Sequence, residues 1–150
     1  MTISSEPTDQ GPKPYVVNIE RATLENSTYR TTLWTGKYLQ MTVMAIAPGD
    51  DIGLEVHEDH DQFLRVESGE GKVQMGPAED QLTFERIVGD DDAILVPAGS
   101  WHNVTNVGTE PLKVYSIYGP PEHKDKVVHK TKAQAEADHD NDEWDGKTTE

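Results

Sequence analysis

The stretch GDDIGLEVHEDHDQFLRVESG, residues 49–69, decides the fold: glycines at both ends enclose a short pattern of polar residues. Glu55 and His57 stand two residues apart within it, and Gln62 follows them. Side chains two apart on a β-strand point to the same face, so Glu55 and His57 can meet one ion side by side. Gln62 is expected to return on the following strand, near the same point.

A second stretch, DDAILVPAGSWHNVTN at residues 91–106, supplies His102 directly after the turn at 97–99. Gly99 lets the chain turn just before His102, and Pro97 stiffens that turn. Two imidazoles, one carboxylate and one amide oxygen are a plausible ligand set for a divalent first-row metal with open positions for a substrate. The sequence therefore predicts a metal site formed by Glu55, His57, Gln62 and His102.

Each predicted ligand has an ordinary alternative. For His57 and His102 it is hydrogen bonding to the backbone inside a barrel. For Glu55 it is a strand bulge that leaves the carboxylate in solvent, because a buried carboxylate must be paired, metal-bound or protonated. Gln62 has a neutral amide, which is a weak metal ligand, so its alternative role is to hold a water molecule or the substrate.

Other polar residues are expected outside the site. His60 lies three residues after His57, so the two side chains would face opposite ways on a continuous strand, and we expect His60 in an exposed turn. His123 and His129 are expected to be solvated. Asn106 is expected to support a turn or the site from behind.

From residue 15 to residue 118 the chain consists of short β-type runs separated by Gly, Pro and Asp. Many short strands with such turn signals are typical of an all-β sandwich or barrel. No helical stripe is visible before residue 120, and residues 15–18 are expected to form a strand. Another run, residues 112–118, places Tyr118 inside. A further run alternates Leu39, Met41, Val43 and Ala45 with Gln40, Thr42 and Met44, as in a strand with one buried face.

Composition divides the chain into three parts. Residues 1–13 are expected to be a flexible N-terminal segment, residues 14–121 the folded domain, and residues 122–150 an acidic tail. In the tail, Thr131 and Gln134 have the spacing of a capping box and predict a short helix. Residues 138–150 are sparse in apolar side chains, which favours fraying.

Composition also excludes several classes of protein. The absence of cysteine excludes disulfides, thiolate zinc sites and a cysteine nucleophile. The formal net charge of -15 argues against nucleic acid as a partner, because phosphate binding needs clusters of lysine and arginine. The sequence does not open like a signal peptide and has no apolar run long enough to span a bilayer. We therefore expect a soluble, cytoplasmic protein with no membrane partner.

The two stretches resemble the paired motifs of the cupin superfamily. The first motif is Gly, five residues, His-x-His, three or four residues, Glu, six residues and Gly; the second is Gly, five residues, Pro-x-Gly, two residues, His, three residues and Asn. The chain matches them at Gly49, His57, Gly69, Pro97, Gly99, His102 and Asn106. It departs from them at Glu55 in place of the first His, Gln62 in place of Glu, and Asp91 in place of the second leading Gly.

The resemblance implies an all-β double-stranded β-helix, or jelly-roll, barrel over residues 14–121, with a short helical or disordered C-terminal tail. The sequence of residues 94–99 is similar to that of small bacterial single-domain cupins described as mannose-6-phosphate isomerase-like. The same resemblance implies a homodimer, in which Tyr15, Leu33 and Trp34 could cover a sheet edge.

The predicted site is compatible with more than one function. The first is an enzyme that acts on a small polar metabolite as a sugar or keto-acid isomerase or lyase. It would use divalent manganese, iron, nickel, cobalt or zinc as a Lewis acid and Glu55 as a catalytic base. A metal-dependent dioxygenase is a variant of this function. The second is a cupin that binds or senses a small ligand without turnover, which the replacements at Glu55 and Gln62 favour. The third is a dimer-forming structural protein without a ligand.

Overall fold

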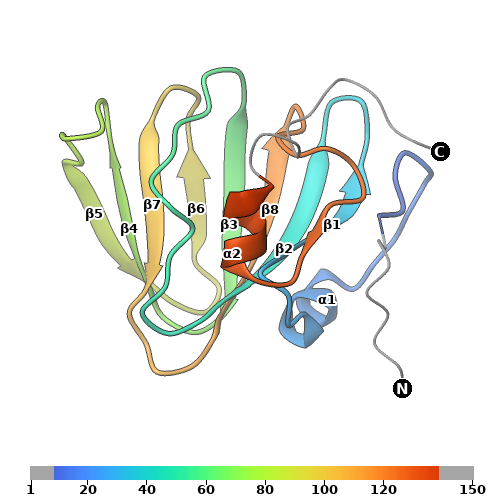
Figure 1. Ribbon diagram of the computed structural model, residues 1–150, viewed down its shortest axis with the longest axis horizontal. Coiled ribbons are helices and arrows are strands. Elements are labelled where there is room, and N and C mark those ends of the chain that lie inside the picture. The colour runs from blue at the N-terminus through green and yellow to red at the C-terminus, as the bar shows by residue number, and fades with distance from the viewer. Residues whose placement is uncertain (1–8, 139–150) are drawn as a thin grey trace.

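The computed structural model describes residues 9–138 and forms two β-sheets with one short helix near each end of that range (Figure 1). The strands are β1 (Arg30–Thr35), β2 (Gln40–Ile46), β3 (Asp61–Ser68), β4 (Gly71–Gly76), β5 (Phe84–Val88), β6 (Ala93–Val96), β7 (Trp101–Asn106), β8 (Leu112–Gly119) and β9 (Val128–His129). The helices are α1 (Ile19–Glu25) and α2 (Lys132–Ala137). The all-β prediction is confirmed.

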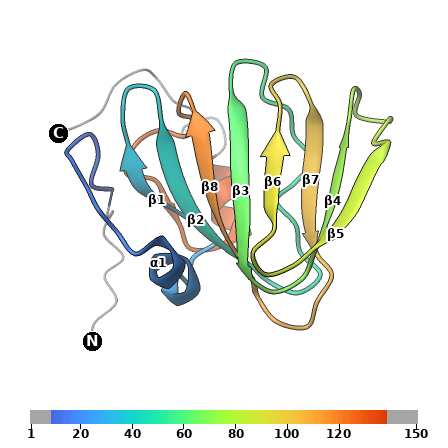
Figure 2. The ribbon, with the colours of Figure 1, turned by 180° about the vertical axis from the view of Figure 1, so that it is seen from behind.

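The strands are joined antiparallel in the order β6-β3-β8-β2-β1-β9 in the larger sheet and β5-β4-β7 in the smaller one. Figure 2 shows from behind how strands distant in sequence become neighbours, with β3 between β6 and β8. The segment between β2 and β3 runs beside β7, which it meets at the isolated bridges Asp51–Thr105 and Glu55–His102. The arrangement is the double-stranded β-helix that the sequence predicts.

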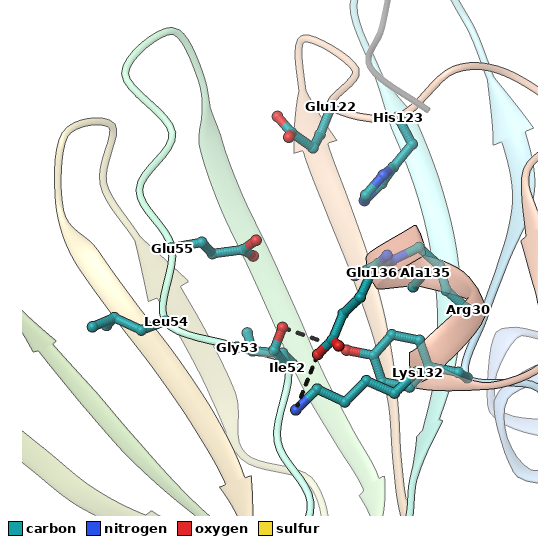
Figure 3. A pocket seen from close by; sticks show the side chains of 11 residues that line it. Arg30, Ile52, Gly53, Leu54, Glu55, Glu122, His123, Lys132, Ala135 and Glu136 are labelled. Carbon is teal, nitrogen blue, oxygen red and sulfur yellow. Dashed lines mark hydrogen bonds and ion pairs between the residues drawn. The ribbon is translucent and has the colours of Figure 1, made fainter. Parts of the chain in front are cut away.

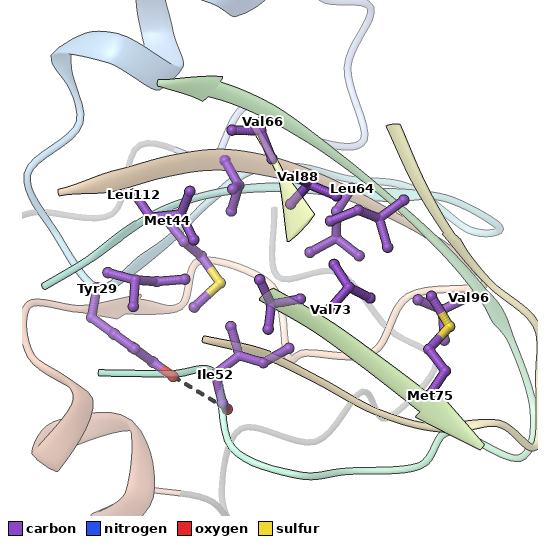
Figure 4. Packing of buried hydrophobic residues seen from close by; sticks show 14 of the residues in the cluster. Tyr29, Met44, Ile52, Leu64, Val66, Val73, Met75, Val88, Val96 and Leu112 are labelled. Carbon is purple, nitrogen blue, oxygen red and sulfur yellow. Dashed lines mark hydrogen bonds between the residues drawn. The ribbon is translucent and has the colours of Figure 1, made fainter. Parts of the chain in front are cut away.

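The hydrophobic core lies between the two sheets (Figure 4). Met44, Leu64 and Leu112 from the larger sheet are at most 1% exposed, as are Val73 and Val104 from the smaller sheet. Burial of each such side chain contributes about 1.5–3 kcal/mol to the free energy of folding. Val96 and Met75 extend this core to the strand positions that pair with Gln62 and His102.

The prediction of the buried face is correct for the alternating run in β8 but not for the one in β2. In β8 the face that carries Tyr118 is buried as predicted, and Tyr118 is only 1% exposed. In β2 the alternation is present, but its inward face carries Gln40, Thr42, Met44 and Ile46, while Leu39 just before the strand is 46% exposed. Gln40 can face inward because its Nε2 donates to Thr35 Oγ1 and to the His123 carbonyl.

Helix α1 follows residues 15–18, which the sequence predicts as a strand, and it lies in a region where the sequence shows no helical stripe. Residues 15–18 are not a strand, and the Asn18 side chain instead caps α1 by accepting a hydrogen bond from the Arg21 N–H at 3.0 Å. The helix has only 7 residues, too few for a repeated apolar stripe to appear in the sequence. It packs against β2, β3 and β8.

The C-terminal helix is confirmed as α2. Thr131 Oγ1 accepts from the Gln134 N–H at 3.2 Å, as the capping box predicts, while Gln134 Oε1 reaches back to the Lys130 N–H at 2.8 Å. Near the other end, Asp9 accepts from Thr35 Oγ1 at 2.6 Å. The expectations of a flexible start and a frayed end fall mostly on residues 1–8 and 139–150, which lie outside the described residues. Within the described part, no helix is long and apolar enough to cross a membrane.

Candidate metal centre

Two predicted ligands are brought together by direct backbone pairing. Glu55, on the segment before β3, donates its N–H to the His102 carbonyl at 3.0 Å and accepts from the His102 N–H at 2.9 Å. The turn before β7 is tied to the same segment, because the Gly99 N–H donates to the His57 carbonyl at 2.8 Å. Gly99 has a φ of 84°, a conformation that favours glycine. The two sequence motifs therefore meet through their backbones.

Their side chains converge. Glu55 Oε1 lies 3.2 Å from His57 Nε2 and 3.5 Å from His102 Nε2. One ligand atom from each of these three residues lies within 4.8 Å of the others. One carboxylate oxygen and two imidazole nitrogens in this arrangement could hold a divalent first-row metal and leave positions open for a substrate. Glu55 is not displaced into solvent by a bulge.

The outer nitrogens of both imidazoles are held by acceptors. His102 Nδ1 lies 3.0 Å from the Ser100 carbonyl oxygen, which can only accept, so Nδ1 carries the proton and Nε2 presents its lone pair. That Nε2 is buried and has no hydrogen-bond partner within the described residues. His57 Nδ1 lies 3.3 Å from Glu122 Oε2. An acceptor behind each imidazole is the usual support of a metal-binding histidine, so these residues fit a metal ion.

Protonation in the metal-free protein follows from the same contacts. Burial alone would lower the pKa of His57, but hydrogen bonds to Glu122 and Glu55 and their charges raise this pKa from 6.5 to about 9. Burial would raise the pKa of Glu55, but its close contacts with the imidazoles of His102 and His57 hold this pKa well below its usual range. Without a metal, a protonated His57 therefore lies between two carboxylates.

Gln62, the fourth predicted ligand, is buried on β3 with 4% exposure. Its Nε2 lies 3.4 Å from Ser116 Oγ, and its Oε1 is buried without a hydrogen-bond partner in the described part of the chain. An unsatisfied buried acceptor is costly, which is consistent with a ligand for this oxygen. The metal-binding role of Gln62 stays a prediction.

The expectation that His60 lies in an exposed turn is wrong. Its imidazole is 9% exposed, stacks on the His57 ring with centroids 4.6 Å apart, and places Nε2 at 2.9 Å from Glu122 Oε2. Residues 57–60 form a bend and not a continuous strand, so the strand alternation rule does not apply to them. His57, His60 and Glu122 form a second group with ligand atoms within 4.8 Å of one another.

His123 and His129, expected to be solvated, are also buried, at 7% and 3% exposure. His123 packs edge-on against Tyr118 with centroids 5.4 Å apart, and His129 Nε2 lies 3.1 Å from Asp138 Oδ2. The chain after β8 folds back over the end of the sandwich, which a reading of that chain as an acidic tail does not anticipate.

Glu122 is a residue of the candidate site that the sequence does not reveal. Burial would raise the pKa of Glu122, but hydrogen bonds from His57 and His60 and their charges lower this pKa to about 2. Its only sequence signal is its position beside Pro120, Pro121 and His123, directly after the last long strand.

A cavity of about 210 Å³ opens beside the centre. Figure 3 shows Glu55 on one side of it and Glu122, His123 and Arg30 across from it. Helix α2 lines it with Lys132, Ala135 and Glu136, on the side opposite Glu55 (Figure 3). The cavity is small and polar, so a substrate of a few heavy atoms would fit it.

Comparison with known proteins agrees with this geometry. The model of the cupin domain matches residues 42–118. The uncharacterized protein YrkC of Bacillus subtilis strain 168 is 60% identical over 132 residues, which cover 88% of this chain and 71% of that protein. The crystal structure of BH2720 from Bacillus halodurans is 59% identical with a TM-score of 0.86, over 87% of this chain and 98% of that chain.

A protein with a double-stranded β-helix domain from Klebsiella pneumoniae has the same fold at 19% identity, with a TM-score of 0.59 over 72% of this chain and 91% of that chain. The family model spans the segment that carries His57 and the strand that carries His102, and the matches to the relatives at 59–60% identity extend well beyond it. The chain belongs to the cupin domain family.

Proposed function

We propose that the protein is a metal-dependent enzyme that acts on a small polar metabolite, as a sugar or keto-acid isomerase or lyase. The observation that carries the proposal is the convergence of Glu55, His57 and His102, with an Nε2 on His102 that is buried and unpartnered within the described residues. The adjoining cavity of about 210 Å³ supplies room for a substrate beside that point.

A divalent ion held by Glu55, His57 and His102 would polarise a carbonyl or enediol oxygen as a Lewis acid. Gln62 would complete the ligand set. Glu55 would serve first as a ligand, because its pKa lies well below the usual range while both histidines contact it. It would act as a proton acceptor only when a substrate displaces it from these contacts.

The second candidate is a module that binds or senses a small ligand without turnover. The observation in its favour is that Glu55, His57 and Glu122 already form a mutually satisfied arrangement, with nitrogen–oxygen distances of 3.2 and 3.3 Å. Such a set needs no metal to neutralise it. A dioxygenase with the same ligands remains a variant of the enzyme hypothesis.

Metal analysis separates these candidates. The protein would be purified without chelators, and its bound metals would be quantified by mass spectrometry beside His102→Ala. About one metal per chain in the wild type and none in the variant supports the enzyme. No metal in the wild type, even after manganese, iron, nickel, cobalt and zinc supplements, supports the binding module.

Turnover would be tested separately. Proton NMR in D₂O detects exchange of the hydrogen next to a carbonyl during sugar isomerisation or keto-acid enolisation. Aldose–ketose exchange of hexose 6-phosphates would support the narrower mannose-6-phosphate isomerase-like hypothesis. A metal-loaded protein that exchanges no substrate of either class would contradict the isomerase proposal.

We also propose that the protein forms a homodimer and acts in the cytoplasm on small molecules, without nucleic-acid or membrane partners. The net charge of -15 favours the absence of nucleic acid. Exposed apolar residues such as Tyr38 and Leu39, 71% and 46% exposed, are available to an interface. Sedimentation that gives only a monomer at micromolar concentration would contradict the dimer.

A further inference from the structure

Arg30 is a buried cation without an ionic partner in the described part of the chain. It lies on β1, is only 6% exposed, and lines the cavity across from Glu55 (Figure 3). Its Nε is buried without a hydrogen-bond partner, and no salt bridge to Arg30 occurs within residues 9–138. By contrast, Arg65 pairs with Glu67 and Asp91. An unpaired buried charge is costly, so Arg30 requires an explanation.

The guanidinium is held in place by packing. Its central carbon lies 5.3 Å from the centroid of the Tyr29 ring, a cation–π contact. Tyr29 is itself fixed, because its hydroxyl lies 3.4 Å from the carbonyl oxygens of Asp51 and Ile52. The backbone of Arg30 pairs with His129 on β9. The side chain is therefore preorganised, which lowers the entropic cost of binding a ligand.

The carboxylates around the cavity already have partners. Glu55 contacts His57 and His102, and Glu122 contacts His57 and His60. The third carboxylate, Glu136, lies 3.9 Å from Lys132 Nζ, which also pairs with Asp50 and Asp51. Within residues 9–138 none of these carboxylates forms an ion pair with Arg30, so its guanidinium remains available to a ligand in the cavity.

Arg30 also lies within electrostatic range of the candidate centre. Burial raises the pKa of Tyr118, and the Arg30 charge is the largest influence opposing that rise. Tyr118 in turn packs edge-on against His57 and His60, with centroids 6.1 and 5.9 Å apart. A ligand bound to Arg30 would thus lie beside the centre.

We infer that Arg30 binds the anionic group, a carboxylate or a phosphate, of the substrate. The free Nε–H and a neighbouring Nη–H form the fork that matches two oxygens of such a group. The inference rests on the proposed function, for which it names the substrate class: a small anion whose reacting carbon lies toward Glu55. A neutral sugar would leave Arg30 without a partner.

Calorimetry with two probes tests this inference and distinguishes the two anions. Inorganic phosphate and pyruvate would be titrated separately into wild type, Arg30→Gln and Arg86→Gln. Arg86 is a matched control, because it also stacks on an aromatic ring, that of Phe84, but is exposed on β5. Each titration would be run on chelator-treated and on metal-loaded protein, so that direct binding to a metal is separated from binding to Arg30.

The expected result is one saturable site in chelator-treated wild type for at least one probe. Arg30→Gln should weaken it by about ten- to one-hundred-fold, the usual effect of losing a charge-assisted hydrogen bond, while Arg86→Gln leaves it unchanged. Metal binding by Arg30→Gln should equal that of wild type. If wild type binds the anion saturably but takes up no metal under any supplement, the anion site stands and the enzyme proposal alone is overturned.

Two results would overturn the inference: no saturable binding of either probe by wild type, or equal binding by Arg30→Gln. If Arg30→Gln does not fold, Arg30→Lys retains the charge but loses the fork, and should still weaken binding. Nitrogen-15 NMR of the wild type gives an independent readout. The Arg30 Nε–H resonance should shift on addition of the bound probe, and an unchanged resonance at saturation contradicts the inference.

Discussion

The side-chain amide of Gln40 is hydrogen-bonded to both backbone groups of His123. Nε2 donates to the His123 carbonyl at 2.8 Å, and Oε1 accepts from the His123 N–H at 2.9 Å. Oε1 also accepts from the Glu122 N–H at 3.2 Å. One fully buried side chain on β2 thus fixes the backbone that carries Glu122, and through Glu122 the orientation of His57.

Replacement of Gln40 by Leu should therefore affect both stability and the centre. It leaves buried backbone groups of residues 122 and 123 unsatisfied, which should lower the free energy of unfolding by about 3 kcal/mol in urea titrations. Misplacement of Glu122 should weaken metal binding about ten-fold. Gln74→Leu, at a partly exposed position on β4, is the control. Unchanged metal affinity in Gln40→Leu would contradict the positioning role.

Substitutions at the ligands should separate strong from weak contributors. His57→Ala and His102→Ala should abolish metal binding, because each removes an imidazole ligand. Gln62→Ala should only weaken it, because an amide oxygen is a weak ligand. Bound metal per chain, measured by mass spectrometry, is the readout. Full occupancy in both histidine variants would refute the proposed centre.

His60→Ala tests how far the group formed by His57, His60 and Glu122 supports metal binding. An exposed His60, as the sequence predicts, would make this change silent, but His60 stacks on His57 and contacts Glu122. We expect metal to be retained with affinity reduced several-fold, because the support behind His57 is loosened. Calorimetric titration with zinc would measure the change. Loss of metal as complete as in His57→Ala would instead make His60 a direct ligand.

The free energy of unfolding of the metal-free protein should be largest at an intermediate pH and should fall toward both acid and alkaline pH. The pKa of His57 is raised from 6.5 to about 9, so its stabilising contribution is complete below pH 6.5 and is lost as the pH rises through about 9. The pKa of Glu122 is lowered from 4.5 to about 2, so its contribution is complete above pH 4.5 and is lost as the pH falls through about 2.

Chelator-treated protein should thus be most stable between about pH 4.5 and 6.5, and urea titrations across pH 3–10 would show this. Glu122→Gln removes one of the two carboxylates that hold the His57 proton, so the alkaline loss should begin at lower pH and be smaller. If wild type and Glu122→Gln lose stability identically at alkaline pH, Glu122 does not hold the His57 proton.

Asn106 offers a test of a purely structural role. It is 1% exposed, and its Nδ2 donates to the Ile46 and Glu110 carbonyls at 2.8 Å each, while its Oδ1 accepts from the Gly108 N–H at 2.9 Å. Asn106→Ala should lower the free energy of unfolding by about 2–4 kcal/mol and leave metal binding at one per chain. Loss of metal by a folded Asn106→Ala would show that Asn106 also supports the site.

The fold and the convergence of Glu55, His57 and His102 could be predicted because both depend on local spacing. Glu55, His57 and His102 follow from strand alternation and the Pro97–Gly99 turn, which act over a few residues. The inward position of His60 could not be predicted, because it depends on a bend between residues 57 and 60 that interrupts the alternation. Helix α1 was too short to produce a periodic signal.

The sequence also does not reveal the residues that line the cavity across from Glu55. Glu122, His123 and Arg30 belong to the cavity only because the chain after β8 returns across the sandwich, and nothing in their neighbouring residues indicates that long-range contact. The inward Gln40 was hidden for a related reason. A polar residue on an alternating strand is normally read as solvent-facing, but here it satisfies the backbone of that returning segment.

The matched family region, residues 42–118, contains Glu55, His57 and His102, whereas Arg30, Glu122 and helix α2 lie outside it. The candidate centre and the part of the cavity wall formed by Arg30, Glu122 and α2 thus lie in different stretches of the sequence, while Ile52, Gly53 and Leu54 line the cavity from within the family region. Substitutions in the flanking stretches can therefore change the shape and charge of the cavity while Glu55, His57, His102 and the apolar core stay unchanged.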